Sequence, residues 1–418
     1  MTSLLISNIQ TEWTFTKVAG GPADDWRIPS GGKPQGQDRE TVSFVQYNSD
    51  FAKIVSRIPK HALLLSSSDS ARNAFFHSGC AHLIESVRGS GDSGGGSNSA
   101  AKAEVLYTVS DYLQPTDSSQ RPVVLISRIE LWRGRDGDID SVEWTKLRSP
   151  PHMAMPTDAI PYHMQAQRGS RRFLGVLYCT RPHRGPTSNG GLFFMRRGKH
   201  PVPLVTSYYG REFNVVRNAV HRSCDGSLWF TESCTGMEQE ECKEPRLPCQ
   251  LYCFDPDTGN VRVVADGLKR PAGVCFSVDE ATLYITDTGS LEDPSTSGGS
   301  AGGSIFSGFG TSNDQDQKKQ QATTIYAYDV LYRAGSSFLT NKRVFAYSLH
   351  GAATAIQCDT AGNVYVGCAA GLEVWNAGGV LLGVIKVPGG VTSFCFARSN
   401  ELFLCSNHQV WWLYMEQI

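Results

Sequence analysis

The chemically capable side chains of this chain do not group into any of the familiar catalytic motifs. Neither an HExxH helix nor a P-loop occurs in the 418 residues, and no Gly-x-Ser-x-Gly turn stands between a strand and a helix. The glycine-rich stretch GGSAGGS also lacks a strand–helix context, so it predicts no phosphate-binding loop. Any chemistry must therefore come from polar residues that the fold brings together from separate segments.

Four cysteines gather in one short segment: Cys234, Cys242, Cys249 and Cys253. Their seven, six and three intervening residues match no compact zinc-ligand spacing. We expect free thiols here, with a Cys242–Cys249 disulfide as the alternative. Other cysteines lie inside apolar strand patterns and are expected to act as small buried hydrophobic residues: Cys179, Cys275, Cys358, Cys395 and Cys405.

The element that recurs along the chain is a short strand, a polar turn and a second strand. Gly267–Gly289 contains it, because the apolar Val274–Phe276 is followed by a polar turn and then by Leu283–Ile285. Comparable units stand at Val220–Glu232, Ala355–Gly367 and Val391–Asn407. No long stretch has helical periodicity, and repeated strand–turn–strand units are typical of propeller blades. The sequence therefore predicts an all-β fold, namely one β-propeller.

Composition excludes several classes of protein. The net charge of −1 gives no sign of a nucleic-acid or anionic-membrane partner, and no run of 18 apolar residues predicts a membrane span. The start MTSLLISNIQTEWTF lacks the basic region and apolar core of a signal peptide, so we expect a cytoplasmic protein. Composition leaves the oligomeric state open.

The chain divides into an N-terminal extension, residues 1–45, and a single propeller domain, residues 46–418. Low-complexity inserts are expected at about 89–103 and 289–324. Both are expected to be disordered, although the apolar Ile305, Phe306 and Phe309 offer a lid as the alternative for the second. Gln409–Tyr414 alternates as a closing strand does, which would send Trp411 and Trp412 to opposite faces.

Three segments carry a family resemblance. PAGVCFSVDEATLYITDTG, YYGREFNVVRNAV with DGSLWFTE, and GNVYVGCAAGLEVWNAGGVLLGVI resemble successive blade motifs of the gluconolactonase and senescence-marker-protein superfamily. The resemblance extends from about Tyr47 to the C-terminus. It implies six blades and, in typical members, a divalent cation, usually calcium, at the centre of the channel.

The positions that match the family's cation ligands have changed. Where the family has a glutamate and an aspartate, this chain has Ser78 and Thr354, and Ala272 replaces an asparagine. At a further asparagine the gap-free alignment puts Arg217, whereas a shift of one residue keeps it as Asn218. A calcium site needs carboxylate and amide oxygens, and an arginine would repel the ion. The resemblance thus implies that the fold is kept, that the metal site is lost and that no cofactor is used.

The same alignment predicts a small-molecule pocket at the channel mouth. It would be lined by Phe76, His77, Ser78, Tyr162, His163, Met164, Gln165, Arg217, Asn218, Thr354 and His408. Arg217 would stabilise developing negative charge, and His77 or His163 would act as acid or position water. Phe76, Tyr162 and Met164 would form apolar walls.

Three functions follow from these expectations. The chain is similar to divergent fungal lactonohydrolase-like propellers that act as metal-independent hetero-Diels–Alderases in tropolone–sesquiterpenoid biosynthesis. That likeness implies dehydration of a hydroxymethyl tropolone to an o-quinone methide and cycloaddition to a humulene-type alkene. The first alternative is a cation-dependent lactonase or esterase that uses Asn218 and Asp287. The second alternative is a non-catalytic propeller that binds a small molecule.

Overall fold

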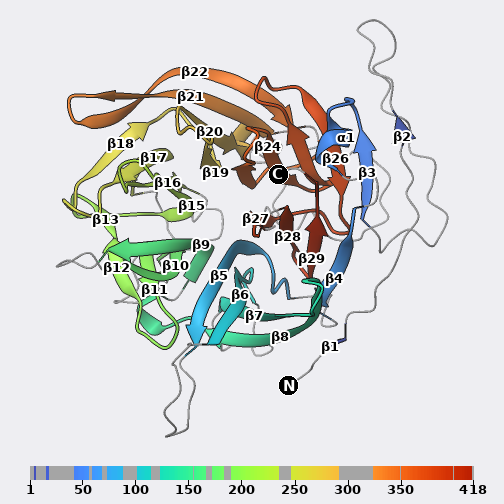
Figure 1. Ribbon diagram of the computed structural model, residues 1–418. Coiled ribbons are helices and arrows are strands. Elements are labelled where there is room, and N and C mark those ends of the chain that lie inside the picture. The colour runs from blue at the N-terminus through green and yellow to red at the C-terminus, as the bar shows by residue number, and fades with distance from the viewer. Residues whose placement is uncertain are drawn as a thin grey trace, which may run out of the picture.

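Nearly every regular element of the described residues is a β-strand, and the main strands form six antiparallel blades around a common axis (Figure 1). The computed structural model describes residues 4–5, 16–17, 42–55, 59–67, 73–87, 101–113, 123–153, 155–165, 172–182, 190–234, 246–290, 323–348, 350–398 and 400–416. The prediction of a six-bladed β-propeller is confirmed. Among the described residues no helix is both long and apolar enough to cross a bilayer.

Each blade contains four main strands, which are numbered from the channel outward in blades 1 to 5. Blade 1 has β5 (Ser78–Val87), β6 (Ala101–Val109), β7 (Leu125–Arg133) and β8 (Ile139–Arg148). Blade 2 has β9 (Met155–Gln165), β10 (Arg172–Arg181), β11 (Gly191–Met195) and β12 (Val202–Val205). Blade 3 has β15 (Val215–His221), β16 (Leu228–Ser233), β17 (Gln250–Phe254) and β18 (Val261–Ala265).

The second half of the ring repeats this pattern. Blade 4 has β19 (Pro271–Phe276), β20 (Thr282–Asp287), β21 (Thr323–Arg333) and β22 (Ser336–Ser348). Blade 5 has β23 (Ala355–Cys358), β24 (Val364–Cys368), β25 (Gly371–Trp375) and β26 (Leu381–Lys386). Blade 6 has β27 (Ser393–Phe396), β28 (Glu401–Ser406), β29 (Gln409–Tyr414) and, outermost, β4 (His61–Ser66).

A few short elements lie outside this pattern. The hairpin β13 (Ser207–Tyr208) and β14 (Arg211–Glu212) forms its own small sheet. The described residues also contain one helical turn, α1 (Phe51–Ile54), and two 3₁₀ turns, η2 (Pro151–Met153) and η3 (Thr288–Ser290).

Strands from the N-terminal part of the chain extend the outer edges of two blades. β1 (Leu4–Leu5) pairs with β8 of blade 1. β3 (Ser43–Gln46) pairs with β26 of blade 5 and carries the parallel β2 (Thr16–Lys17) on its other side. Extra strands at these edges give the backbone groups of β8 and β26 hydrogen-bonding partners.

The ring closes by pairing the two ends of the chain. β29 pairs antiparallel with β4, so that one blade contains strands from both termini of the propeller domain. This agrees with the expectation that Gln409–Tyr414 is a closing strand. The inner strands β5, β9, β15, β19, β23 and β27 contact one another in sequence around the channel, and β27 returns to β5.

The buried apolar side chains of the described residues gather between neighbouring blades. Trp411 packs in the cluster between blades 5 and 6, whereas Trp412 packs in the cluster between blades 6 and 1. The two tryptophans thus lie on opposite faces of β29, as the alternation of a strand requires. Because each blade buries both of its faces, the core holds the blades in fixed positions around the channel.

The two predicted low-complexity inserts lie largely outside the described residues. Their described ends belong to regular elements: β6 begins at Ala101, η3 ends at Ser290 and β21 begins at Thr323. The choice between disorder and a lid for the second insert stays a prediction.

Candidate functional site

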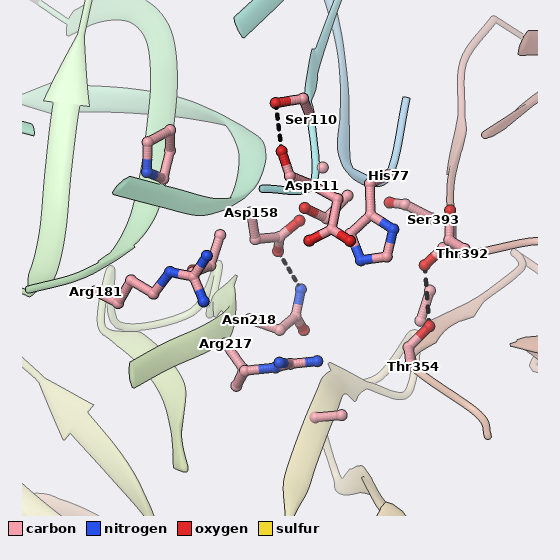
Figure 2. Close-up of a pocket in the computed structure, with 16 residues that line it drawn as sticks. His77, Ser110, Asp111, Asp158, Arg181, Arg217, Asn218, Thr354, Thr392 and Ser393 are labelled. Carbon is pink, nitrogen blue, oxygen red and sulfur yellow. Dashed lines mark hydrogen bonds between the residues drawn. The ribbon is translucent and has the colours of Figure 1, made fainter. Parts of the chain in front are cut away.

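A small polar cavity lies at one end of the channel, where the inner strands begin. Its volume is about 70 Å³. All six blades contribute to its wall, and Figure 2 shows the labelled side chains converging from different strands. The lining residues are His77, Ser78, Gly79, Ser110, Asp111, Pro156, Thr157, Asp158, Arg181, Arg217, Asn218, Ala272, Thr354, Ala355, Thr392 and Ser393.

Breaks in strand register aim several of these residues at the cavity. In β5 the pairing shifts between Ser78 and Ala81, and in β15 it shifts between Val216 and Ala219. β19 shifts after Pro271, and the pairing of β9 with β10 shifts next to Asp158. A bulge inserts an unpaired residue and turns side chains away from simple alternation, and bulges are frequent beside active sites. Arg217 and Asn218 are therefore presented to the channel by the break in β15.

Asp158 is a buried carboxyl group at the centre of the site. Burial raises its pKa to about 7, although Asn218, the backbone amides of Ala159 and Gly79, and the charge of Arg217 all act in the opposite direction. Its Oδ2 accepts a hydrogen bond from Nδ2 of Asn218. A carboxyl group with this pKa exchanges its proton near neutral pH, which is the property required of a general acid or base.

Asn218 ties three blades together at the cavity. Its Nδ2 donates to Asp158 of blade 2, and its Oδ1 accepts a 2.8 Å hydrogen bond from the backbone amide of Val274 in blade 4. One of the two lone pairs of the side-chain oxygen is therefore engaged. Asn218 thus holds Asp158 in position.

The residues at the cavity do not fit a resident divalent cation. Ala272 has no donor atom, the Thr354 hydroxyl donates to the carbonyl oxygen of Thr392 at 3.0 Å, and the Asn218 oxygen is engaged. Arg217 lines the same space. In the part of the chain that the structure describes, no group of three or more His, Cys, Asp or Glu residues is arranged to hold a metal ion. A divalent cation prefers several oxygen ligands without a cation beside them.

The buried Arg181 and the partly buried Arg217 supply positive charge to the site. Figure 2 shows the Arg217 side chain reaching past Asn218 toward the side of Thr354. Burial lowers the pKa of Arg217, whereas the charges of Asp111 and Asp158 raise it. Arg181 stacks its guanidinium over the Tyr112 ring, 3.4 Å from the ring centroid. Two fixed guanidinium groups favour a substrate that carries or develops negative charge.

His77 reaches the cavity from the segment before β5. Its Nδ1 lies 2.7 Å from Oδ1 of Asn407, a residue of the β28–β29 turn in blade 6. The imidazole is therefore oriented by a partner across the junction of the first and last blades.

Of the predicted site residues, the structure brings together His77, Ser78, Arg217, Asn218 and Thr354.

Four predicted residues lie toward the opposite end of β9. The strand enters the cavity at Pro156–Asp158, whereas Tyr162, His163, Met164 and Gln165 follow four to seven residues later. At about 3.3 Å per residue, His163 is roughly 16 Å further along the strand than Asp158. Tyr162 packs edge-on against Phe194 in the core between blades 2 and 3. None of the four lines the cavity, so their expected roles have no geometric support.

Phe76 and His408 also lie away from the cavity wall. Phe76 is fully buried and packs against Trp144, with ring centroids 4.9 Å apart. Nδ1 of His408 lies 3.2 Å from the carbonyl oxygen of Asn73. Phe76 thus belongs to the core between blades 6 and 1, not to an apolar wall of the site.

The sequence reasoning missed the charged residues Asp111, Asp158 and Arg181. A usable signal was present for Asp158: it stands at the start of an inner strand, as Asn218 and Thr354 do. Comparing strand starts across all blades would have found it. Asp111 follows the end of β6, and Arg181 is the last residue of β10. Both strands are the second of their blade, and no motif of the resemblance includes these positions.

Asp287, which the cation-dependent alternative would use, has a structural role. Its carboxylate accepts hydrogen bonds from the backbone amides of Lys269, Arg270 and Gly289. Glu232 occupies the matching place in blade 3, where it accepts from the amide of Asn214. Burial raises the pKa of Glu232 to about 8. Both residues hold the turn that leads into an inner strand.

The fold and the site together define a class of protein: six-bladed propellers with a polar pocket where the inner strands begin. Residues 186–292 match the family described as SMP-30/Gluconolactonase/LRE-like region. Lactonohydrolase oryL of Aspergillus oryzae is 30% identical over 47% of this chain and 43% of its own length. Lactonohydrolase oryH of the same organism is 27% identical over 40% of this chain and 34% of its own length.

The structural comparison extends over most of the propeller. A gluconolactonase from Xanthomonas campestris superposes with a TM-score of 0.57 and 19% identity, covering 88% of this chain and 94% of that one. This likeness concerns the fold. The chain thus has the fold of this gluconolactonase, and its residues 186–292 are similar in sequence to the gluconolactonase family. It aligns with less than half the length of the two lactonohydrolases.

Proposed function

We propose that the protein is an enzyme that hydrolyses small lactones with its own side chains in place of a divalent cation. The observation that carries this proposal is the cluster of Asp158, Asn218 and Arg217 at the channel centre, where typical relatives are expected to hold a cation. The similarity to lactonohydrolases supports the substrate class. A polar cavity of about 70 Å³ suits a small oxygenated ring.

In the proposed reaction Asp158 is the general base. Its carboxylate takes a proton from a water molecule, whose oxygen attacks the lactone carbonyl carbon. Arg217 stabilises the negative charge that develops on the carbonyl oxygen. The ring C–O bond then breaks, the ring oxygen receives the proton from Asp158, and a hydroxy acid leaves. Asn218 holds Asp158 in place during both proton transfers.

The experiment that tests this proposal measures acid release from a panel of small lactones before and after exhaustive chelation. We expect hydrolysis that chelator does not reduce and added calcium does not raise, because Arg217 and the engaged Asn218 oxygen disfavour a cation. Elemental analysis of the same sample should find no stoichiometric calcium or zinc. Activity that disappears on chelation and returns with calcium would overturn the metal-independent mechanism.

A second candidate is a metal-independent hetero-Diels–Alderase, which one specific observation favours. Because the pKa of Asp158 is raised to about 7, this group is protonated over a wide range of pH and is able to donate a proton to a leaving hydroxyl. In a hydroxymethyl tropolone, Asp158 gives its proton to the hydroxymethyl oxygen, water leaves, and the ring O–H returns a proton to the Asp158 carboxylate, which gives an o-quinone methide. Cycloaddition to a humulene-type alkene then forms one C–C and one C–O bond, with Arg217 holding the tropolone oxygen.

The two candidates differ in how much space they need. Pockets for drug-sized ligands have about 300–1,000 Å³, whereas this cavity has about 70 Å³. A tropolone and a sesquiterpene together would therefore extend well beyond this cavity, whereas a small lactone would extend beyond it less. The smaller space that a lactone needs therefore favours hydrolysis over the cycloaddition as the proposed function.

The pH dependence of turnover separates the candidates. A base at Asp158 is active when deprotonated, so hydrolysis should rise as pH increases through about 7. An acid at Asp158 is active when protonated, so dehydration should fall over the same interval. A rate that does not change on either side of this pKa would contradict both assignments of Asp158.

A further inference from the structure

Two cysteines meet where blade 3 reaches the site end of the channel. Cys234 follows the last residue of β16, and Cys249 precedes β17. The antiparallel pairing of β16 with β17 reaches Glu232 opposite Gln250, so that the two cysteines lie just beyond this last pair of the ladder. The backbone amide of Cys234 donates to Sγ of Cys249 at 3.2 Å, and Sγ of Cys234 lies 3.3 Å from the carbonyl oxygen of Leu247.

The surroundings make the two thiols unequal. A hydrogen bond from the Cys234 thiol, assisted by the Cys234 amide, lowers the pKa of Cys249. The same contact raises the pKa of Cys234. Both residues are half-buried, whereas Cys80 and Cys395, which also approach each other with 3.2 Å between their sulfur atoms, are buried in the core. Only a thiol that is both ionised and accessible reacts readily.

We propose that Cys234 and Cys249 form a redox-reactive dithiol that a low-molecular-weight disulfide converts into an intrachain disulfide. Cys249 is the attacking thiol and Cys234 the resolving thiol. The two cysteines stand at the two ends of the segment between β16 and β17. A disulfide between them would therefore link these neighbouring strands covalently. This modification is independent of the lactonase proposal.

The proposed exchange is balanced in atoms and electrons. The Cys249 thiolate attacks one sulfur of the disulfide R–S–S–R, its S–S bond breaks, and the first RS⁻ leaves. Cys234 loses its proton and attacks Sγ of Cys249 in the mixed disulfide, which releases the second RS⁻. The two protons from the cysteines are taken up by the two leaving thiolates. The protein dithiol is oxidised by two electrons, and R–S–S–R is reduced to two R–SH.

The first test is competitive labelling of the native protein with limiting N-ethylmaleimide near neutral pH, read by peptide mass spectrometry. Cys224 is the internal control, because it is exposed, while partial desolvation and a hydrogen bond to Glu280 raise its pKa to about 11. We expect Cys249 to react on the order of ten times faster than Cys224. Faster labelling of Cys224 would show that exposure governs reactivity and would overturn the assignment of the attacking thiol.

The second test is incubation with oxidised glutathione, followed by mapping of disulfide-linked peptides. We expect a Cys234–Cys249 bond in the native chain. In the Cys234→Ser variant we expect a stable glutathione adduct on Cys249, because the resolving thiol is missing. A Cys242–Cys249 bond, or an unreacted Cys249, would overturn the proposal. A Cys224→Ser variant should give the same result as the unaltered chain.

Discussion

Two buried carboxyl groups of this propeller, Glu104 and Asp158, have opposite electrostatic environments. Glu104 lies at the junction of blades 1 and 6, where Arg133 makes two hydrogen bonds to it and His82 and Arg398 add one each. Burial disfavours its ionised form, but the bonds from Arg133 and His82 prevail and lower its pKa to about 2. Burial of Asp158 prevails instead, and raises its pKa to about 7.

The difference, together with the position of Asp158 on the cavity wall, distinguishes a functional group from a structural one. Arg133 also binds both oxygens of Glu401 in blade 6, so the Glu104 network joins the first blade to the last with every carboxylate oxygen paired. Glu104 therefore stays ionised over the physiological range of pH. Asp158 lines a cavity and is able to change protonation near neutral pH, which catalysis requires.

The largest expected effect distinguishes the two carboxyl groups by activity. Asp158→Asn should lower turnover by about 10²–10⁴-fold, because it removes the proton-transfer group. Glu104→Gln is the matched control: it makes the same chemical change at a buried carboxyl group away from the cavity, and it should leave the turnover of the folded protein unchanged. Steady-state kinetics on both variants checks this. Equal losses in the two variants would remove the distinction.

Stability should depend on the Glu104 network more than on Asp158. Arg133→Ala leaves Glu104 and Glu401 buried without their shared cation, and breaking a buried ion pair costs about 3–5 kcal/mol. Urea denaturation should show this loss, while the protein that remains folded keeps its turnover. A change below about 1 kcal/mol would mean that the junction of blades 1 and 6 does not depend on the network.

Arg217 tests the cationic side of the cavity. Arg217→Ala should lower turnover on the order of 10–1000-fold, by analogy with the loss of a preorganised oxyanion donor. Arg217→Lys should recover only part of it, because an ammonium group lacks the planar fork of donors. If Arg217 braces the blades instead, Arg217→Ala should lower the melting temperature and leave turnover nearly intact. Both quantities are measured on the same variant.

A smaller effect appears in the pH dependence of stability. The folded pKa of Asp158 lies above its unfolded value of 3.8, so this group makes folding less favourable as pH rises from about 4 to about 7. The folded pKa of Glu104 lies below its unfolded value of 4.5, so its contribution is complete above that value and is lost as pH falls through about 2. Denaturation curves should show that Asp158→Asn removes the first dependence and leaves the second.

The fold could be predicted because it depends on local patterns. The strand–turn–strand units and the alternation of Gln409–Tyr414 follow from hydrophobic periodicity and turn chemistry, and the structure has these strands. Arg217, Asn218, Thr354, Ser78 and His77 were found because the family motifs place them. These motifs lie at the starts of inner strands, which are the parts of the blades that meet at the cavity.

The remaining site residues depend on features that a linear pattern does not contain. Tyr162–Gln165 belongs to the same strand as Asp158, but which end of β9 reaches the cavity is decided by the arrangement of the blades. Register breaks also disturb the simple alternation of side chains, as at Val216/Ala219. Arg181 reaches the cavity from a second strand, which no inner-strand motif describes.

The most direct test of the account is a titration of the two carboxyl groups by NMR of protein labelled with ¹³C at aspartate and glutamate side chains. Signals are assigned by their absence in Asp158→Asn and Glu104→Gln. The account predicts that Asp158 titrates at about 7 and that Glu104 stays ionised down to about 2. An Asp158 signal that titrates at or below its ordinary value of 3.8 would contradict the assignment of this residue as the proton-transfer group of the site.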